Sequence, residues 1–274
     1  MTEHGKSTLV SLVILGAVLL FWEVGAGADA QSAAQGEYDA LVARAEETAR
    51  IPPPSQVLRL AVEQLADPLY DRGPNDKGVG LQLLFSLGRV LSGYLLALCV
   101  AIPAGFLIGM SPLMLRALNP FIQLLKPISP LAWMPIALFM IKDSVSSSIF
   151  VIFICSLWPV LINTAFGVSS VRRDFINVAK TLELTPLRTA FTVILPAAAP
   201  TILTGMRISI GISWLVIVAA EMLVGGTGIG YYVWNEWNNL DLAAVIFSIL
   251  MIGAVGMALD ATLAYATKKL SYQD

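Results

Sequence analysis

The chain has 274 residues, of which 57% are hydrophobic and only 13% charged, and its mean hydropathy is +0.75. Soluble domains usually carry about a quarter charged residues, so this deficit indicates that lipid is the main solvent. A net charge of −2 excludes the basic surface that nucleic-acid binding requires, and both cysteines lie in apolar runs, where a thiol behaves as a small hydrophobic group.

Six apolar stretches have the length of roughly 17–25 residues that a membrane-spanning helix needs. The predicted spans are residues 9–26, 85–110, 120–141, 149–168, 201–224 and 242–266. The sequence therefore predicts an all-α polytopic membrane protein with six transmembrane helices. The first span follows Lys6, as in a secretory signal, but its apolar run is long for a signal core, so we expect an uncleaved anchor.

The longest polar part lies between the first two spans. Residues 31–50 predict a helix, and residues 51–55 predict an extended segment because each of their three prolines disfavours helix in its predecessor. Residues 56–66 predict a second amphipathic helix, and residues 67–80, rich in Asp, Gly, Pro and Asn, predict a loop.

The third span contains four prolines and therefore cannot be one straight helix. A broken helix at membrane depth is tolerated only where it is packed in protein or lines a cavity. We predict a break within residues 126–135, a short connection at 111–119 before the span, and a polar turn at 142–148 after it.

A polar segment joins the fourth and fifth spans. Apolar residues recur at helical spacing on both sides of Pro186, which predicts two short amphipathic helices. Asn177 or Asp174 is placed to cap the first helix, and Thr185 to cap the second. Such a segment offers an apolar stripe to a soluble partner, or it lies on the membrane surface as an ordinary amphipathic loop.

Basic residues in the short loops predict the orientation of the spans. With a cytoplasmic N-terminus, the short outside loops carry only Lys142. The inside segments then carry Lys6, Arg116, Lys126, Arg172, Arg173, Lys180, Arg188, Lys268 and Lys269. We therefore expect both termini and the segment between the fourth and fifth spans to be cytoplasmic.

The run Val193-Ile-Leu-Pro196 resembles the end of the "EAA" coupling loop of ABC importer permeases. That pattern reads Glu-Ala-Ala, three residues, Gly, nine residues, Ile-x-Leu-Pro. In this register residues 177–179, Asn-Val-Ala, occupy the Glu-Ala-Ala places and Glu183 occupies the Gly place. Because Glu lacks the freedom of glycine for positive φ, we predict a right-handed backbone conformation at Glu183.

Three further stretches resemble the nitrate/sulfonate/taurine branch of these permeases. They are Lys126-Pro-Ile-Ser-Pro-Leu-Ala-Trp-Met-Pro-Ile-Ala-Leu-Phe139, Gly205-Met-Arg-Ile-Ser-Ile-Gly-Ile-Ser-Trp214 and Ala219-Ala-Glu-Met-Leu-Val-Gly-Gly-Thr-Gly-Ile-Gly230. Trp234-Asn-Glu-Trp-Asn-Asn239 is most similar to the nitrate/bicarbonate/cyanate subgroup. The resemblance covers about residues 50–270.

The resemblance implies the type I ABC importer permease fold, with a cytoplasmic coupling helix between helices four and five, in the plasma (inner) membrane of a prokaryote. The implied partners are a second copy of the permease, two cytoplasmic ATPase subunits that bind ATP and Mg²⁺, and an extracytoplasmic substrate-binding protein. The sequence itself lacks the Gly-x-x-x-x-Gly-Lys-Ser/Thr phosphate cradle, so we expect neither enzymatic activity nor a bound cofactor.

The chain then divides into an N-terminal transmembrane helix (1–26), an extracytoplasmic amphipathic segment (27–84) and a five-helix permease core (85–274) whose coupling loop is 172–200. Phe175, Leu182 and Leu187 are the expected apolar anchors on the ATPase. The full set of implied coupling residues is Phe175, Asn177, Val178, Ala179, Leu182, Glu183 and Leu187.

Three ionisable residues lie within the last two predicted spans, where an unpaired charge is costly. Arg207 and Asp260 lie at similar depth, so we expect them to pair. Glu221 lies near the outer end of its span, on the side where Arg89 begins the second span, and these two residues are also placed to pair. We favour a structural role over a transport role for Arg207 and Asp260, and a structural role over that of a gate element for Glu221.

A path for a small anion needs weak donors and few fixed charges. Candidates are Ser209, Ser213 and Trp214 on the fifth span, and Ser129 and Trp133 at the break in the third. The alternative is that these small residues only permit close helix packing.

The implied function is that of the transmembrane subunit of an ATP-driven importer for a small inorganic anion. Nitrate comes first, followed by nitrite, bicarbonate and cyanate, and alkylsulfonate or taurine is the alternative within the branch. A secondary transporter would need inverted repeats and ligands for a coupling ion, and an enzyme embedded in the membrane would need a catalytic constellation. Neither feature is recognisable in the sequence.

Overall fold

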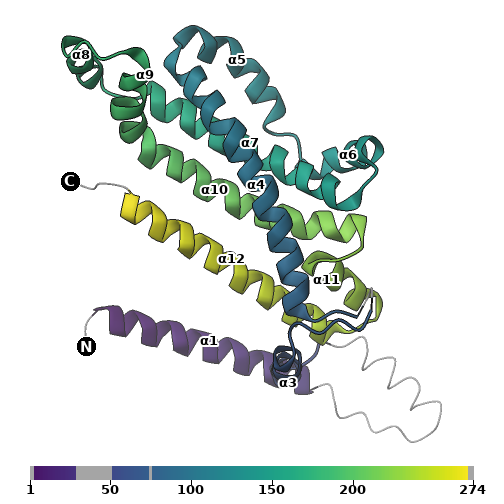
Figure 1. The fold of residues 1–274 in the computed structure, drawn as a ribbon. Coiled ribbons are helices and arrows are strands. Elements are labelled where there is room, and N and C mark those ends of the chain that lie inside the picture. Colours follow the sequence, from purple (N-terminus) through teal and green to yellow (C-terminus); the bar gives the residue numbers. More distant parts are fainter. Residues whose placement is uncertain (1–2, 29–50, 74–75, 271–274) are drawn as a thin grey trace, which may run out of the picture. The chain divides into compact units, whose positions relative to one another are not determined.

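The computed structural model describes residues 3–28, 51–73 and 76–270, and this part of the chain is helical apart from turns and one isolated bridge between Asp71 and Lys77 (Figure 1). The helix predicted at 31–50 lies outside the described residues. The all-α prediction is confirmed.

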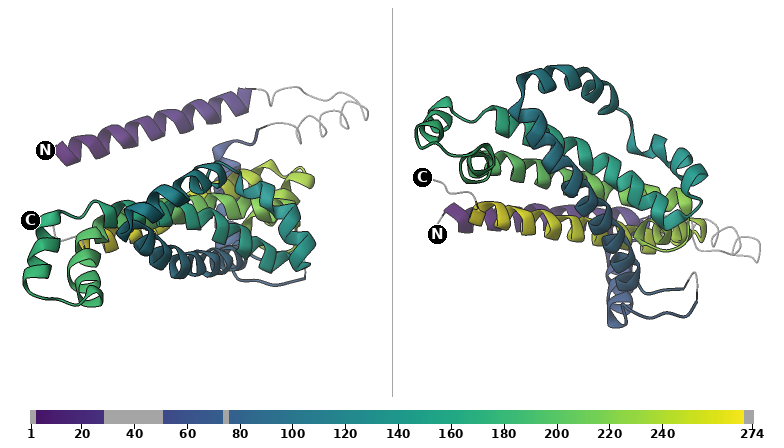
Figure 2. Two further views of the ribbon diagram at one scale, coloured as in Figure 1. Left: turned by 90° about the horizontal axis from the view of Figure 1, so that it is seen from above. Right: turned by 45° about the horizontal axis from the view of Figure 1, so that its top comes forward.

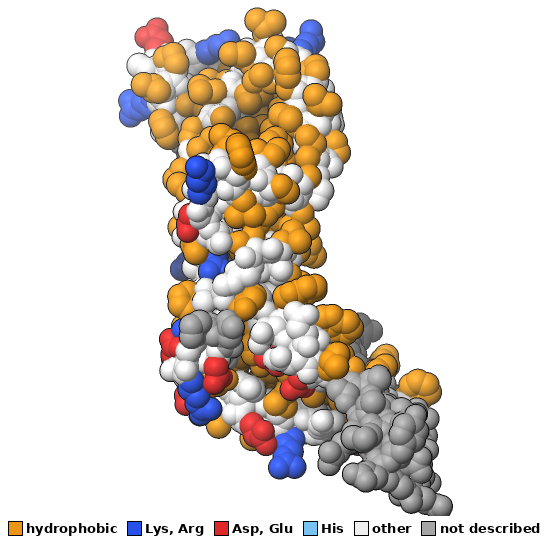
Figure 3. All heavy atoms as spheres, turned by 90° about the vertical axis from the view of Figure 1, so that its right-hand side faces the viewer, with side chains coloured by type: hydrophobic (Ala, Val, Ile, Leu, Met, Phe, Trp, Pro, Cys, Tyr) orange, Lys and Arg blue, Asp and Glu red, His pale blue; other side chains and the backbone are white. Residues whose placement is uncertain are grey.

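Five helical runs among the described residues are long and apolar enough to cross a membrane. They are α1 (Glu3–Ala28), α4 (Val79–Met110), α7 (Ser144–Ser169), the run Pro186–Val224 that ends in α10 (Leu195–Val224), and α12 (Leu242–Leu270). α5 (Pro112–Leu125) and a second segment, Pro130–Ile141, form a sixth span if they are counted together across their 84° bend. Hydrophobic side chains cover more of the face drawn in Figure 3 than charged ones do, as expected of a surface in lipid.

The predicted break in the third span is confirmed, but the connection predicted before it is wrong (Figures 1 and 2). Residues 112–119 are already helical, because Ser111 accepts a hydrogen bond from the Met114 amide (3.3 Å) and Pro112 occupies the first helical turn. A Ser-Pro pair that reads as a turn therefore begins α5. After the break, a 3₁₀ turn (Pro130–Trp133) leads into α6 (Met134–Ile141).

The polar turn predicted at 142–148 is shorter than expected. Lys142 adopts a left-handed conformation, with φ of 57°, after the end of α6, and α7 begins at Ser144. The Asp143 carboxylate caps α7 by accepting from the Ser146 amide (2.7 Å). Hydrogen bonds from Ser146 hold the pKa of this carboxyl below its usual range.

The chain forms two compact units, one comprising residues 1–81 and 232–251 and the other residues 82–231 and 252–274. In the first unit, α3 (Pro54–Ala66) confirms the helix predicted at 56–66 and begins two residues earlier. Its N-terminus is tied to α1, because the Ser55 amide and hydroxyl donate to the Glu23 carboxylate at 3.2 and 2.9 Å. The second unit contains every residue of the predicted sites.

α4, α7 and α10 form the core of the second unit. Three glycines of α4 permit close contact with α7: an added Cβ would lie 2.7 Å from the Ile149 carbonyl at Gly93, 2.7 Å from that of Leu161 at Gly105, and 2.6 Å from that of Ala165 at Gly109. Buried aliphatic side chains fill the rest of the core, including Val151 and Ile217, which are fully buried. This packing positions α10, the helix that carries Arg207 and Glu221.

Candidate functional site

The segment between α7 and α10 forms the two helices that were predicted. α8 (Arg173–Thr181) and α9 (Pro186–Thr189) flank a short turn, and a π-helical turn (Ala190–Ile194) leads into α10. The predicted cap of α9 is confirmed, since Thr185 accepts from the Arg188 amide at 3.4 Å. The predicted cap of α8 is wrong.

Neither candidate for that cap has the required position. Arg172 is the residue that precedes α8, and it makes no side-chain cap. Asn177 lies inside the helix, and Asp174 lies in its first turn, where its carboxylate accepts from Arg172 at 2.9 Å. An acidic group in the first turn still interacts favourably with the helix dipole.

The right-handed conformation predicted at Glu183 is wrong: its φ is 53°. The reason lies in the hydrogen bonds that end α8. The Leu184 amide donates to the Ala179 carbonyl (3.1 Å) and the Glu183 amide to the Lys180 carbonyl (3.0 Å), which together form a Schellman motif. This motif needs a left-handed residue between its two ends, and Glu183 takes that conformation although glycine would adopt it at lower cost.

We predict that Glu183→Gly stabilises the end of α8, because a non-glycine residue in the left-handed region costs about 1–2 kcal/mol. Amide exchange at Leu182 and Leu184 should then slow by about fivefold or more, since exchange there follows local opening. Hydrogen-exchange mass spectrometry of the purified complex measures this. Glu183→Ala is the control, because it removes the carboxylate and keeps Cβ, and equal slowing in both variants would contradict the conformational explanation.

The two short helices present an apolar surface that is not covered by the described chain. Phe175 is 47% exposed, Val178 58%, Leu182 65% and Leu187 74%. We call these four residues the coupling surface. Ala179, predicted with them, is only 1% exposed and packs within the chain, whereas Asn177 and Glu183 are exposed.

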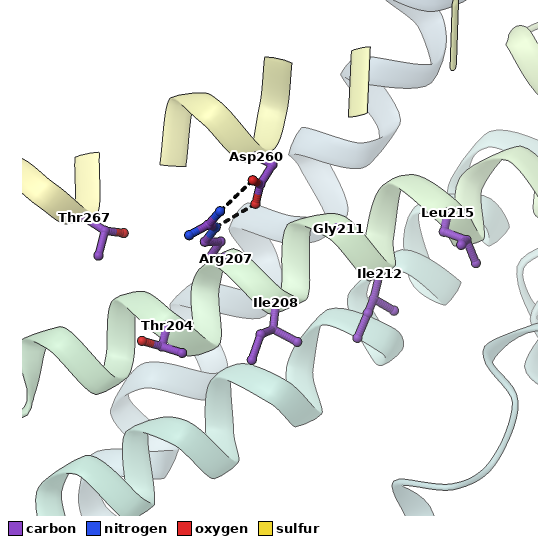
Figure 4. A pocket seen from close by; sticks show the side chains of 8 residues that line it. All are labelled: Thr204, Arg207, Ile208, Gly211, Ile212, Leu215, Asp260 and Thr267. Carbon is purple, nitrogen blue, oxygen red and sulfur yellow. Dashed lines mark hydrogen bonds and ion pairs between the residues drawn. The ribbon is translucent and has the colours of Figure 1, made fainter. Parts of the chain in front are cut away.

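The second candidate region is a groove between α10 and α12 (Figure 4). The predicted pairing of Arg207 with Asp260 is confirmed and is bidentate: Nε donates to Oδ1 and Nη2 to Oδ2, each at 2.6 Å. The two side chains remain 45% and 54% exposed. The groove has a volume of about 620 Å³, and its lining residues are Thr204, Arg207, Ile208, Gly211, Ile212, Leu215, Asp260 and Thr267.

The serines proposed for the path do not line this groove. Ser209 and Ser213 are fully buried, where Ser209 donates to the Ser156 carbonyl (3.0 Å) and the Ser213 and Ser156 hydroxyls lie 2.6 Å apart. Trp214 is 5% exposed and donates to the Ile252 carbonyl at 3.0 Å. Close packing of α7 on α10, the alternative in the sequence analysis, accounts for the two serines.

The residues proposed at the break have a different environment. Ser129 is exposed, and Trp133 is half-buried with a buried Nε1 that has no hydrogen-bond partner among the described residues.

The groove residues that sequence reasoning missed include Thr204 and Gly211. They lie three and four residues from Arg207, so the helical spacing around a charged residue was the signal that could have found them.

The predicted pairing of Glu221 with Arg89 is also confirmed, at 2.7 Å between Nη1 and Oε1. Both side chains are buried, with 0% of Glu221 and 9% of Arg89 exposed. The Ser86 hydroxyl lies 2.9 and 2.8 Å from the two carboxylate oxygens, and the Gly230 amide donates to Oε2 at 3.0 Å. A carboxylate with this many donors remains satisfied when it is buried.

The same cluster holds the glycine-rich turn between α10 and α11 (Ile229–Asn238). Three side chains on one face of α4 contact the turn. Gln82 accepts from the Gly228 amide (2.6 Å), Ser86 accepts from the Ile229 amide (2.9 Å), and Arg89 donates to the Thr227 hydroxyl (2.8 Å). Gly228 has a φ of 123°, and a Cβ there would lie 2.2 Å from the Glu221 carboxyl carbon. The position of this glycine-rich turn therefore depends on Glu221.

A multi-span helical chain with an amphipathic helix pair between two spans has the architecture of the membrane subunit of an importer. The chain belongs to the family described as "binding-protein-dependent transport system inner membrane component", whose members it matches over residues 101–272. It is therefore a multi-pass membrane permease of an ABC importer, not an enzyme. Such an importer includes ATPase and substrate-binding partners.

Several relatives are similar over four fifths of the chain. The nitrate import permease protein NrtB of Synechocystis sp. is 44% identical over 219 residues, which are 80% of each chain. The bicarbonate transport system permease protein CmpB of the same organism is 44% identical over 225 residues, 81% of this chain and 80% of that one. The NrtB protein of Synechococcus elongatus is 40% identical over 226 residues, 81% of each.

A solved structure supports the type I importer permease fold. A chain of the MetNI methionine ABC transporter, in an inward-facing conformation, superimposes with a TM-score of 0.61 at 11% identity. The match covers 69% of this chain and 94% of the other.

Proposed function

We propose that this chain is the membrane subunit through which a small inorganic oxyanion, nitrate first and bicarbonate next, enters the cell. The names of its relatives support this substrate class. The observation within the structure that carries it is the groove between α10 and α12, where the guanidinium of Arg207 is the cationic group among the lining residues. A cation within membrane-spanning helices is costly unless it pairs with an opposite charge or faces a water-filled cavity. A cation that faces such a cavity attracts anions.

The coupling surface is proposed to meet the ATPase subunits. Four exposed apolar side chains on two short helices form the kind of face that docks in a groove of a partner. In this assignment α8, α9 and both chain termini are cytoplasmic, in the plasma membrane of a prokaryote, which agrees with the basic residues of the short loops. A second copy of the chain completes the path, and ATP and Mg²⁺ bind to the partner subunits.

Reconstitution tests this function. The permease, its ATPases and its binding protein are placed in liposomes, and uptake and ATP hydrolysis are measured with nitrate, bicarbonate, taurine and methanesulfonate. We expect nitrate or bicarbonate to support uptake and to stimulate ATP hydrolysis, and the sulfonates to do neither. Uptake of taurine or methanesulfonate without uptake of the two oxyanions would contradict the proposal.

A further inference from the structure

We propose that Arg207 is an oxyanion-binding group of the translocation path and that Asp260 is its resident counter-anion, which keeps binding weak enough for release. This inference rests on the proposed function, because it assigns the anion a contact within the membrane. It also changes the role expected from the sequence, which favoured a purely structural ion pair.

The Arg207–Asp260 pair lies away from the ends of both helices that carry it. Arg207 is 12 residues after the start of α10 at Leu195 (207 − 195), or about 18 Å along the helix axis. Asp260 is 10 residues before the end of α12 at Leu270 (270 − 260), or about 15 Å. Both therefore lie well inside spanning helices, where half-exposed charges do not face hydrocarbon. In the proposed assembly, the open side of the groove faces a water-filled path between the two copies.

The Arg207 guanidinium has one edge bound to Asp260 and a second edge available to an anion. Asp260 occupies the Nε and Nη2 edge, and the described residues offer Nη1 no hydrogen bond. Figure 4 shows this third nitrogen directed away from Asp260. A guanidinium has a second edge, Nη1 and Nη2, which matches two oxygens of a planar oxyanion such as nitrate or bicarbonate. Arg207 can therefore bind an anion without releasing Asp260.

The other polar groups of the groove do not supply competing donors. The Thr204 hydroxyl donates to the Pro200 carbonyl at 2.9 Å, and the Thr267 hydroxyl to the Leu263 carbonyl at 2.8 Å. The remaining lining residues are aliphatic or glycine. Arg207 therefore provides the attraction for an anion, and the aliphatic side chains limit how many donors it meets.

The negative charge of Asp260 weakens the attraction between Arg207 and a bound anion. Coulomb energy falls with distance, so a carboxylate about twice as far from the anion as the guanidinium cancels about half of the attraction. A transport site must bind strongly enough to admit the anion and weakly enough to release it. An arginine without its carboxylate would hold the anion too long, and a groove without the arginine would not attract it.

Asp260→Asn tests the counter-anion directly. Nitrate binding to the purified permease–ATPase complex in nanodiscs, without the binding protein, is measured by equilibrium dialysis. We expect the variant to bind nitrate about tenfold more tightly than wild type, because the repulsion of one charge is lost. Its uptake at saturating binding protein should fall, because release slows.

Arg207→Gln combined with Asp260→Asn keeps a neutral hydrogen-bonding pair, so assembly should persist while nitrate uptake falls at least tenfold. Arg116→Gln, which removes an exposed arginine of α5, is the matched control and should transport as wild type does. Wild-type nitrate uptake by the double variant would show that the pair is only structural and would overturn the inference. If wild type itself transports a different anion, the proposed function fails, and the same variants test Arg207 with that anion.

Discussion

Leu182→Asp combined with Leu187→Asp is expected to abolish transport and to release the ATPase subunits from the membrane. The two side chains are 65% and 74% exposed, so the substitutions leave the folded chain intact. A carboxylate placed in an apolar groove of a partner loses its hydration without gaining a counter-charge. Each substitution should cost about 2 kcal/mol or more of binding free energy, so the affinity for the ATPases should fall by roughly 10³-fold.

Co-purification of the ATPases with the tagged permease measures this loss, and uptake into liposomes measures its consequence. Leu182→Met with Leu187→Met is the matched control, because it changes shape but keeps both side chains apolar, and we expect near-normal assembly. If the Asp variant still retains its ATPases and transports the anion, α8 and α9 are not the coupling element. The amphipathic loop on the membrane surface would then be the better interpretation.

Helix positions could largely be predicted from the sequence, because long apolar runs and prolines act locally. The break in the third span followed from its prolines, and the separation of α8 from α9 followed from Pro186. The boundaries were less predictable, because a residue such as Ser111 favours both turns and helix caps. Which of the two it forms depends on the hydrogen bonds available to the next turn.

Glu183 shows how the intrinsic preference of a residue can predict the wrong backbone conformation. Counting back from Pro196 placed Glu183 at the family's glycine position, and the structure has a left-handed residue there. The intrinsic preference of Glu predicted the opposite, but two hydrogen bonds at the end of α8 outweigh that preference. Local propensity is a weak guide where a helix end imposes its own geometry.

The two ion pairs could be predicted because charged residues are scarce within the spans, so each has few available partners. The groove and the contacts that hold the glycine-rich turn could not be predicted in the same way. The donors to Glu221 include the Gly230 amide, and backbone donors have no signature in the sequence. The burial of Ser209 and Ser213 could not be predicted either, because a serine suits helix packing as well as it suits a pore.

Arg89→Gln is expected to lower the stability of the permease by about 3–5 kcal/mol, because it removes one partner of a buried ion pair and leaves the other charged. The Glu221 side chain is 0% exposed and has no access to water. Its remaining donors, Ser86 and the Gly230 amide, do not neutralise its charge. We expect little assembled complex in the membrane and a lower unfolding temperature in detergent.

Adding Glu221→Gln to Arg89→Gln should recover much of the loss. The amide oxygen can still accept from Ser86 and Gly230, and no buried charge remains. Arg207→Gln is the matched control, because that ion pair is half exposed and its loss should reduce assembly far less. Equal stability of Arg89→Gln alone and of the double variant would show that the buried charge is not what the arginine compensates. The glycine-rich turn would then depend on the hydrogen bonds from Arg89 to Thr227, not on the neutralisation of Glu221.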